Sequence, residues 1–164
     1  MTLRIWIETN HQAPYRTGGW AWLRQIGKAM SGAAGGDRDL DAEGFCVRAL
    51  QAAVADLPPD KAIALHLSDP LLIEGVRTMS ARRAAGWQDV AGAPVPDAVV
   101  WETVAEALAG RALSLVRTQP SDARTPAGFA AAWAELARDR AKAKGAFKNP
   151  IPRPNLTKVR GLHA

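Results

Sequence analysis

The feature that most constrains the fold is the opening run of the chain, residues 3–8, which has the alternation of a β-strand. Leu3, Ile5 and Ile7 take every second position, and the run ends at Glu8. The pattern therefore presents the Glu8 carboxylate where sheet gives way to loop. In open α/β sheets, binding and catalytic groups gather at the carboxyl ends of central strands. Glu8 is accordingly the first candidate site residue.

The order of the remaining strand and helix patterns limits the topology. Two strand patterns, residues 19–26 and 28–33, follow and predict an antiparallel meander with the opening strand. The later strands are expected at 62–68 and 111–117, and the helices at 41–57, 70–76, 98–109 and 125–144. Strands joined through a helix run parallel with a right-handed crossover. The sequence thus predicts an α/β fold with a mixed five-stranded sheet of order 3-2-1-4-5, flanked by helices on both faces.

The basic residues are concentrated near the end of the chain. The net charge is +5, yet residues 138–164 hold eight Lys or Arg residues and one Asp, so the preceding part is slightly acidic. Three prolines fall between Asn149 and Pro154, and proline removes backbone donors, so regular packing is not expected there. We therefore predict a domain of residues 1–144 and a basic extension of residues 145–164. The extension either grips phosphate or is a solvated, extended arm.

Length and cysteine usage fit a single intracellular domain. A chain of 164 residues can form one core without covalent cross-links. Cys46 is the only cysteine, so no internal disulfide forms, which is consistent with a reducing compartment. The sequence shows no leader pattern and no apolar run long enough to span a bilayer. We expect a cytoplasmic protein without membrane contact.

Three carboxylates can meet at one edge of the predicted sheet. Glu8 ends the first strand, Asp69 ends the fourth strand beside it, and Glu43 lies early in the helix between them. Mg²⁺ and Mn²⁺ prefer oxygen ligands, and carboxylates combine with substrate phosphate oxygens in sites of phosphoryl chemistry. The alternative interpretation is structural: Asp69 caps a helix, and Glu43 complements the dipole of a helix N-terminus.

Several short motifs resemble the ribonuclease H family, and together they span most of residues 3–144. The motifs are Ile5–Asn10, Glu43 with the alanine-rich run after Phe45, His66–Asp69, Arg82–Trp87 followed by Val99–Trp101, and Ala134–Ala137. The resemblance implies cleavage of the RNA strand of an RNA–DNA hybrid by four carboxylates and two Mg²⁺ or Mn²⁺ ions. It assigns metal binding and catalysis to Glu8, Glu43 and Asp69.

The chain departs from the family pattern where the chemistry is concentrated. Ala134 stands at the place of the last acid and has no oxygen to offer a metal. Glu8 is one methylene longer than the aspartate it resembles, in a kind of site where placement to about 0.5 Å matters. Losing one metal removes several kcal/mol of transition-state stabilisation, and each ~1.36 kcal/mol is tenfold in rate. Weakened cleavage is therefore expected.

The expected nucleic-acid contacts come from a protrusion after the fourth strand: Arg82, Arg83, Trp87 and Trp101. The favoured interpretation is a ribonuclease-H-like protein that binds nucleic acid, an RNA–DNA hybrid or a related duplex, with weakened or lost metal-dependent cleavage. Two alternatives remain open. One is an active hybrid hydrolase in which Asp122 or Glu135 replaces the lost ligand. The other is a protein-interaction scaffold that does not bind nucleic acid.

Overall fold

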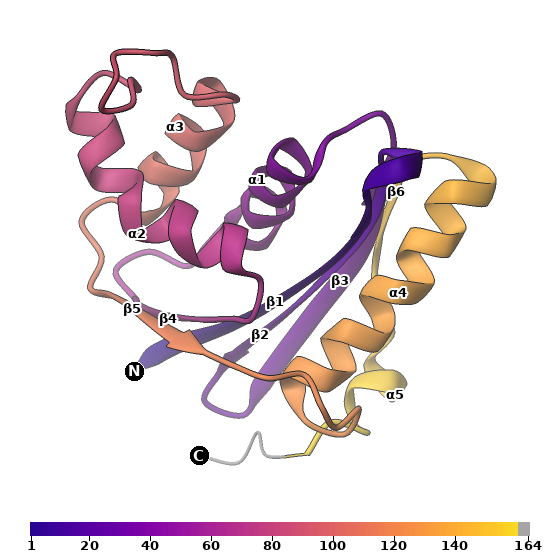
Figure 1. Ribbon diagram of the computed structural model, residues 1–164. Coiled ribbons are helices and arrows are strands. Elements are labelled where there is room, and N and C mark those ends of the chain that lie inside the picture. The colour runs from indigo at the N-terminus through magenta and orange to yellow at the C-terminus, as the bar shows by residue number, and fades with distance from the viewer. Residues whose placement is uncertain (161–164) are drawn as a thin grey trace.

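A mixed six-stranded sheet organises the computed structural model, which describes residues 1–160 (Figure 1). The strands are β1 (Thr2–Gln12), β2 (Thr17–Ile26), β3 (Ala29–Asp37), β4 (Ala62–Leu67), β5 (Leu113–Arg117) and β6 (Phe147–Pro150). Their order in the sheet is β5-β4-β1-β2-β3-β6. β1, β4 and β5 run parallel, and the pairings β1–β2, β2–β3 and β3–β6 are antiparallel. The predicted α/β class and the order of the first five strands are confirmed, and β6 is an additional edge strand.

Within residues 1–160, three of the five α-helices begin at a side chain that caps them. The helices are α1 (Ala42–Val54), α2 (Pro70–Ala84), α3 (Ala98–Leu108), α4 (Pro126–Lys144) and α5 (Arg153–Leu156), with a 3-10 turn η1 (Ala13–Tyr15). The Asp41 carboxylate accepts a hydrogen bond from the Gly44 backbone N–H at 2.8 Å, and Thr125 caps α4 in the same way. Asp97 precedes α3 as predicted, but its side chain forms an ion pair with Arg48 at 3.1 Å instead of capping the helix.

Helices cover both faces of the sheet, as predicted (Figure 1). α1, α2 and α3 lie on one face, where Leu3, Ile5 and Ile7 of β1 join the larger core. α4 lies along the other face, where Trp6 and Ala21 join a second core with α4 alanines. Successive side chains of β1 thus supply the two cores alternately. Within residues 1–160, no helix is both long and apolar enough to cross a bilayer.

Glycine allows α4 to lie directly against β2. A Cβ atom on Gly19 would overlap the carbonyl oxygen of Ala134 and the backbone amide of Arg138. Any larger residue at position 19 would push the helix away from the sheet. Since Gly19 pairs with Asn10 of β1, this close approach also brings the middle of α4 to the carboxyl-terminal part of β1.

The segment after α4 packs on the sheet, so the prediction of an irregular, extended arm is wrong for residues 147–159. β6 pairs with β3 from Gly36 opposite Phe147 to Ala33 opposite Pro150. Ile151 follows and donates its backbone N–H to the Gly32 carbonyl at 2.9 Å. An edge strand needs hydrogen bonds on one side only, so it tolerates proline where a central strand would not. Residues 161–164 of the predicted extension lie outside the described residues.

Candidate active site

Glu8 is a buried carboxylate near the end of β1. Glu8 is 3% exposed, and one of its carboxylate oxygens, Oε2, accepts a hydrogen bond from the Ser68 hydroxyl at 2.5 Å. The other oxygen, Oε1, is buried without a hydrogen-bond partner among the described residues. Burial raises the pKa of Glu8 to about 7, and the charge of Asp69 adds to this, against the opposing Ser68 hydrogen bond. Glu8 is therefore partly protonated at neutral pH.

Asp69 follows β4 and begins α2. Its Oδ1 accepts a hydrogen bond from the Leu71 backbone N–H at 2.8 Å, which is the capping contact that Asp69-Pro70 suggests. Its Oδ2 accepts from the Thr9 hydroxyl at 2.5 Å and from the Cys46 thiol at 3.4 Å. Burial and the Asp69 charge raise the pKa of the Cys46 thiol, so this group stays a neutral donor. Both Asp69 oxygens are thus occupied by protein donors.

The two carboxylates lie on opposite faces of the sheet. β1 and β4 are parallel, with Ile7 opposite Leu67, so the next two positions along pair Glu8 with Ser68 and Thr9 with Asp69. Adjacent residues of a strand point to opposite faces. Glu8 shares the α4 face with Trp6, whereas Asp69 meets Cys46 of α1. The Asp69 charge nevertheless acts on Glu8, and shared metal binding by these two acids stays a prediction.

Glu43 lies in the first turn of α1, on the same side of the sheet as Asp69. The Glu43 charge helps to raise the pKa of the Cys46 thiol, and the same thiol donates to Asp69. Cys46 therefore interacts with both acids. Across residues 1–160, however, no three His, Cys, Asp or Glu side chains are grouped closely enough to hold a metal ion. Hydroxyl, thiol and amide donors already occupy the oxygens of Asp69 and one oxygen of Glu8. The donor set therefore does not fit the pair of metal ions that the resemblance implies.

Known structures with the same architecture were found at low sequence identity. The chain is similar to LC9-RNase H1, a type 1 RNase H with the type 2 active-site motif, with a TM-score of 0.68, 12% identity, and coverage of 95% of this chain and 79% of that one. The chain has a ribonuclease-H-like fold. No protein-family model matches the sequence, and no curated protein does.

Two structures of a foamy viral protease-reverse transcriptase share the ribonuclease-H-like fold. The structure with dsDNA matches with a TM-score of 0.62 and 12% identity, over 84% of this chain and 92% of that one. The structure with an RNA/DNA hybrid matches with a TM-score of 0.62 and 11% identity, and this chain spans only 20% of it. At such low identity these matches establish the fold.

The Asn10 amide and the Arg138 guanidinium meet near the end of β1, where α4 lies against the sheet. Ala134, which stands at the place of the family's last acid, is fully buried with its carbonyl against Gly19, opposite Asn10. The Arg138 guanidinium, one turn along α4, donates to the Asn10 side-chain oxygen at 2.7 Å and also pairs with Asp139. Neither Asn10 nor Arg138 is among the site residues predicted from the sequence. Nothing in the local pattern indicates that these residues, 128 positions apart, meet.

The residues considered as replacement ligands lie elsewhere. Asp122, in the loop before α4, forms an ion pair with Arg124 at 3.2 Å, and this contact lowers the pKa of the Asp122 carboxyl. Glu135 is exposed on α4, next to the buried Ala134. Ser68 and Thr9, the hydroxyl partners of the acids, are likewise absent from the predicted site residues. The signal was present, since each hydroxyl is adjacent in sequence to the carboxylate that the other one binds.

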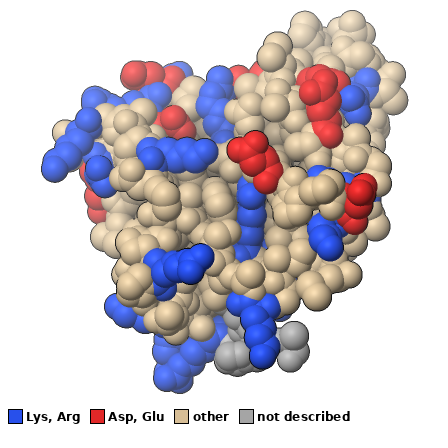
Figure 2. All heavy atoms as spheres, turned by 180° about the vertical axis from the view of Figure 1, so that it is seen from behind, with Lys and Arg blue, Asp and Glu red and all other residues tan. Residues whose placement is uncertain are grey.

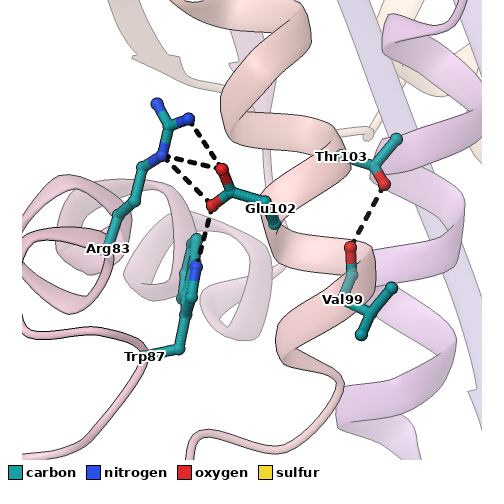
Figure 3. Close-up of polar contacts among 5 residues, drawn as sticks. All are labelled: Arg83, Trp87, Val99, Glu102 and Thr103. Carbon is teal, nitrogen blue, oxygen red and sulfur yellow. Dashed lines mark hydrogen bonds and ion pairs between the residues drawn. The ribbon is translucent and has the colours of Figure 1, made fainter.

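The protrusion is held together by its own polar side chains (Figure 3). Arg83 forms a two-pronged contact with the Glu102 carboxylate, at 2.7 and 3.1 Å, and the Trp87 indole N–H donates to the same carboxylate at 2.8 Å. Trp101 is 9% exposed and packs against Gly75, so it belongs to the core. Of the predicted nucleic-acid contacts, Arg82 and the buried Trp101 line one cleft.

This cleft lies between α1, α2, α3 and the loop before α3. Its volume is about 270 Å³, and Trp101 and Gly75 contribute to its lining. The charged lining residues are Glu43, Glu74, Asp89, Asp97 and Arg82. Four carboxylates against one guanidinium make the cleft acidic, so it repels phosphate groups.

Proposed function

We propose that the chain binds nucleic acid, an RNA–DNA hybrid or a related duplex, and that its metal-dependent cleavage is weakened or lost. The proposed loss of cleavage rests on the hydrogen bonds that each of the two acids accepts from a residue of the neighbouring strand end. Glu8 accepts from Ser68 on one face of the sheet, and Asp69 accepts from Thr9 on the other. Hydroxyl donors on both acids, which approach from different faces of the sheet, compete with the metal ions that two-metal phosphoryl transfer requires.

Two observations support the nucleic-acid partner. The solved foamy viral proteins that share this fold were captured with dsDNA and with an RNA/DNA hybrid. The present chain also has a strongly basic segment, residues 138–164, on a body that is slightly acidic. Concentrated positive charge gives affinity for phosphate backbones by releasing counterions. An interaction scaffold without nucleic-acid binding would not need this distribution.

Any residual Mg²⁺ or Mn²⁺ would be held by Glu8, Glu43 and Asp69, as the sequence resemblance implies. A metal must then displace the proton that Glu8 carries at a pKa of about 7, and the hydroxyl and thiol donors on Asp69. These competing contacts are the reason to expect weak metal binding. Such an ion would supply charge stabilisation at phosphate oxygens.

We expect the chain to bind a labelled RNA–DNA hybrid without needing a divalent cation. Fluorescence anisotropy in low salt with EDTA should show saturable binding that weakens as salt is added. A double-stranded DNA of the same sequence tests hybrid preference in the same assay. Absence of binding to either duplex at low salt would overturn the nucleic-acid proposal and favour the interaction scaffold.

We expect cleavage of the hybrid in Mn²⁺ to be at least about 10³-fold slower than with a ribonuclease H that has four active-site carboxylates, because the loss of about 4 kcal/mol of stabilisation has that effect on rate. Gel analysis of the labelled RNA strand measures it. Asp69→Asn is the control: any residual cleavage that is unaffected by this change comes from contamination. Rapid cleavage that Asp69→Asn abolishes would instead establish the active hydrolase.

A further inference from the structure

The positive charge of the protein does not lie where the ribonuclease H resemblance places it. In the protrusion, Arg83 is bound to Glu102, and Arg82 faces a cleft with four carboxylates. Residues 138–164 carry most of the excess positive charge. A duplex therefore gains more electrostatic attraction from the end of the chain than from the protrusion.

Residues 147–160 form a docked segment with two sides. Ile151, Leu156 and Val159 are buried and join the core on the α4 face. Arg153 and Lys158, which lie between them in sequence, are exposed. The apolar residues therefore dock the segment, and docking turns its basic residues outward. Charges held on a docked segment lose less conformational freedom on binding than charges on a flexible arm do.

The docked segment extends to Arg160, which is also exposed. The Arg160 backbone N–H donates to the Arg124 carbonyl at 2.6 Å, so the segment is bound at this residue to the loop before α4. Seen from behind, the charged side chains at the lower end of the molecule, where α5 lies in Figure 1, are Lys and Arg (Figure 2). The acidic side chains of that view lie above this lower end. The end of the molecule at α5 is thus a basic surface.

We propose that the surface formed by Arg153, Lys158 and Arg160, called here the α5 surface, contacts the phosphate backbone of the bound duplex. The inference rests on the proposed nucleic-acid binding and adds the place of contact. The surface offers exposed cations on a docked scaffold and no base-reading element such as a helix that enters a groove. Its contribution is therefore independent of base sequence and sensitive to salt.

The test is a salt series of hybrid binding with a triple variant, Arg153→Gln, Lys158→Gln and Arg160→Gln. Losing three phosphate contacts should reduce the slope of log K against log salt by about 2–3, and affinity at about 50 mM salt should fall roughly 10²–10³-fold. The matched control replaces three basic residues that are exposed elsewhere on the molecule, Arg38, Arg77 and Arg117, with glutamine. Its net charge change is the same, and its slope should change by less than about 1.

The outcomes separate this inference from the proposed function. If the wild-type chain binds and both triple variants lose the same slope, overall charge explains binding and the α5 surface is not the contact. If the α5 variant keeps the wild-type slope, the inference is also overturned while nucleic-acid binding stands. If the wild-type chain binds no duplex at all, the proposed function itself fails. A selective loss of slope in the α5 variant supports the inference.

Discussion

Replacing Glu8 with glutamine should stabilise the fold by about 3 kcal/mol at pH 8 and have little effect near pH 4.5. The pKa of Glu8 is raised from 4.5 to about 7, mainly by burial. The folded state therefore binds a proton that the unfolded state has released between these values. Above pH 7 Glu8 is ionised and its full destabilising effect is present. This effect disappears as the pH falls to 4.5. Glutamine has the same shape and keeps an oxygen for the Ser68 hydroxyl.

His66 has the opposite effect in nearly the same pH window. It is 9% exposed and stacks on Trp6 with ring centroids 4.7 Å apart. Burial and the nearby Arg4 charge lower the pKa of His66 from 6.5 to about 4. The unfolded state then binds the extra proton, so stability falls as the pH drops from 6.5 to 4. In the wild-type chain, the pH dependences of Glu8 and His66 largely cancel.

Each single substitution should therefore produce a pH dependence of the free energy of unfolding that the wild-type chain does not show. With Glu8→Gln, the free energy of unfolding should rise by about 3 kcal/mol between pH 4 and 6.5, from His66 alone. With His66→Gln, it should fall by about 3 kcal/mol between pH 4.5 and 7, from Glu8 alone. Urea unfolding in EDTA across this range measures both. Only the slope is compared for His66→Gln, because losing the stack on Trp6 lowers stability at every pH.

Glu135→Gln is the matched control, because Glu135 is exposed and lies on α4. It should leave the pH dependence of unfolding unchanged. Parallel pH profiles for wild type, Glu8→Gln and His66→Gln would show that neither group has a shifted pKa. The acid at position 8 would then be solvated, and the argument that a proton competes with metal binding at this carboxylate would fail.

Local patterns were sufficient to predict the architecture. The alternation of residues 3–8 and the apolar run at 62–68 predict β1 and β4. The order of the five strands then follows from the right-handed crossover rule. These features depend on periodicity and on chain connectivity. Both are visible in a sequence.

Register was not predictable, and it decides the site. Whether Glu8 and Asp69 share a face depends on Ile7 pairing with Leu67, and a slip of one residue would reverse every side chain of one strand. No local pattern specifies that pairing. The contact of Arg138 with Asn10 depends likewise on how α4 lies on β2. The sequence therefore indicated which acids to examine but not which groups they meet.

The C-terminal segment was misjudged for a different reason. Its prolines argue against regular packing, yet β6 is an edge strand with an unpaired outer side, where proline is tolerated. Neither the period of a strand nor that of a helix fits the spacing of the buried residues Ile151, Leu156 and Val159, because this stretch consists of a four-residue helix and turns. Burial of such isolated apolar residues depends on the core that receives them.

A chain that ends at Lys144 should be less stable than the full chain by about 4 kcal/mol. Burying Ile151, Leu156 and Val159 contributes about 1.5–3 kcal/mol each, and the entropy of ordering the segment offsets part of the total. The truncation also removes the β6–β3 hydrogen bonds and reopens the edge of β3. Urea unfolding of both chains at one pH measures the difference.

The control for the truncation is the full chain with Arg153, Lys158 and Arg160 replaced by glutamine. These side chains are exposed, so this variant should unfold within about 0.5 kcal/mol of the wild type. The two variants together separate the roles of the segment, because its apolar residues stabilise the sheet whereas its basic residues are available to a partner. A truncated chain as stable as the full one would restore the predicted boundary after residue 144. The segment would then be an extension whose docking adds nothing to the fold, and the α5 surface would lose its scaffold.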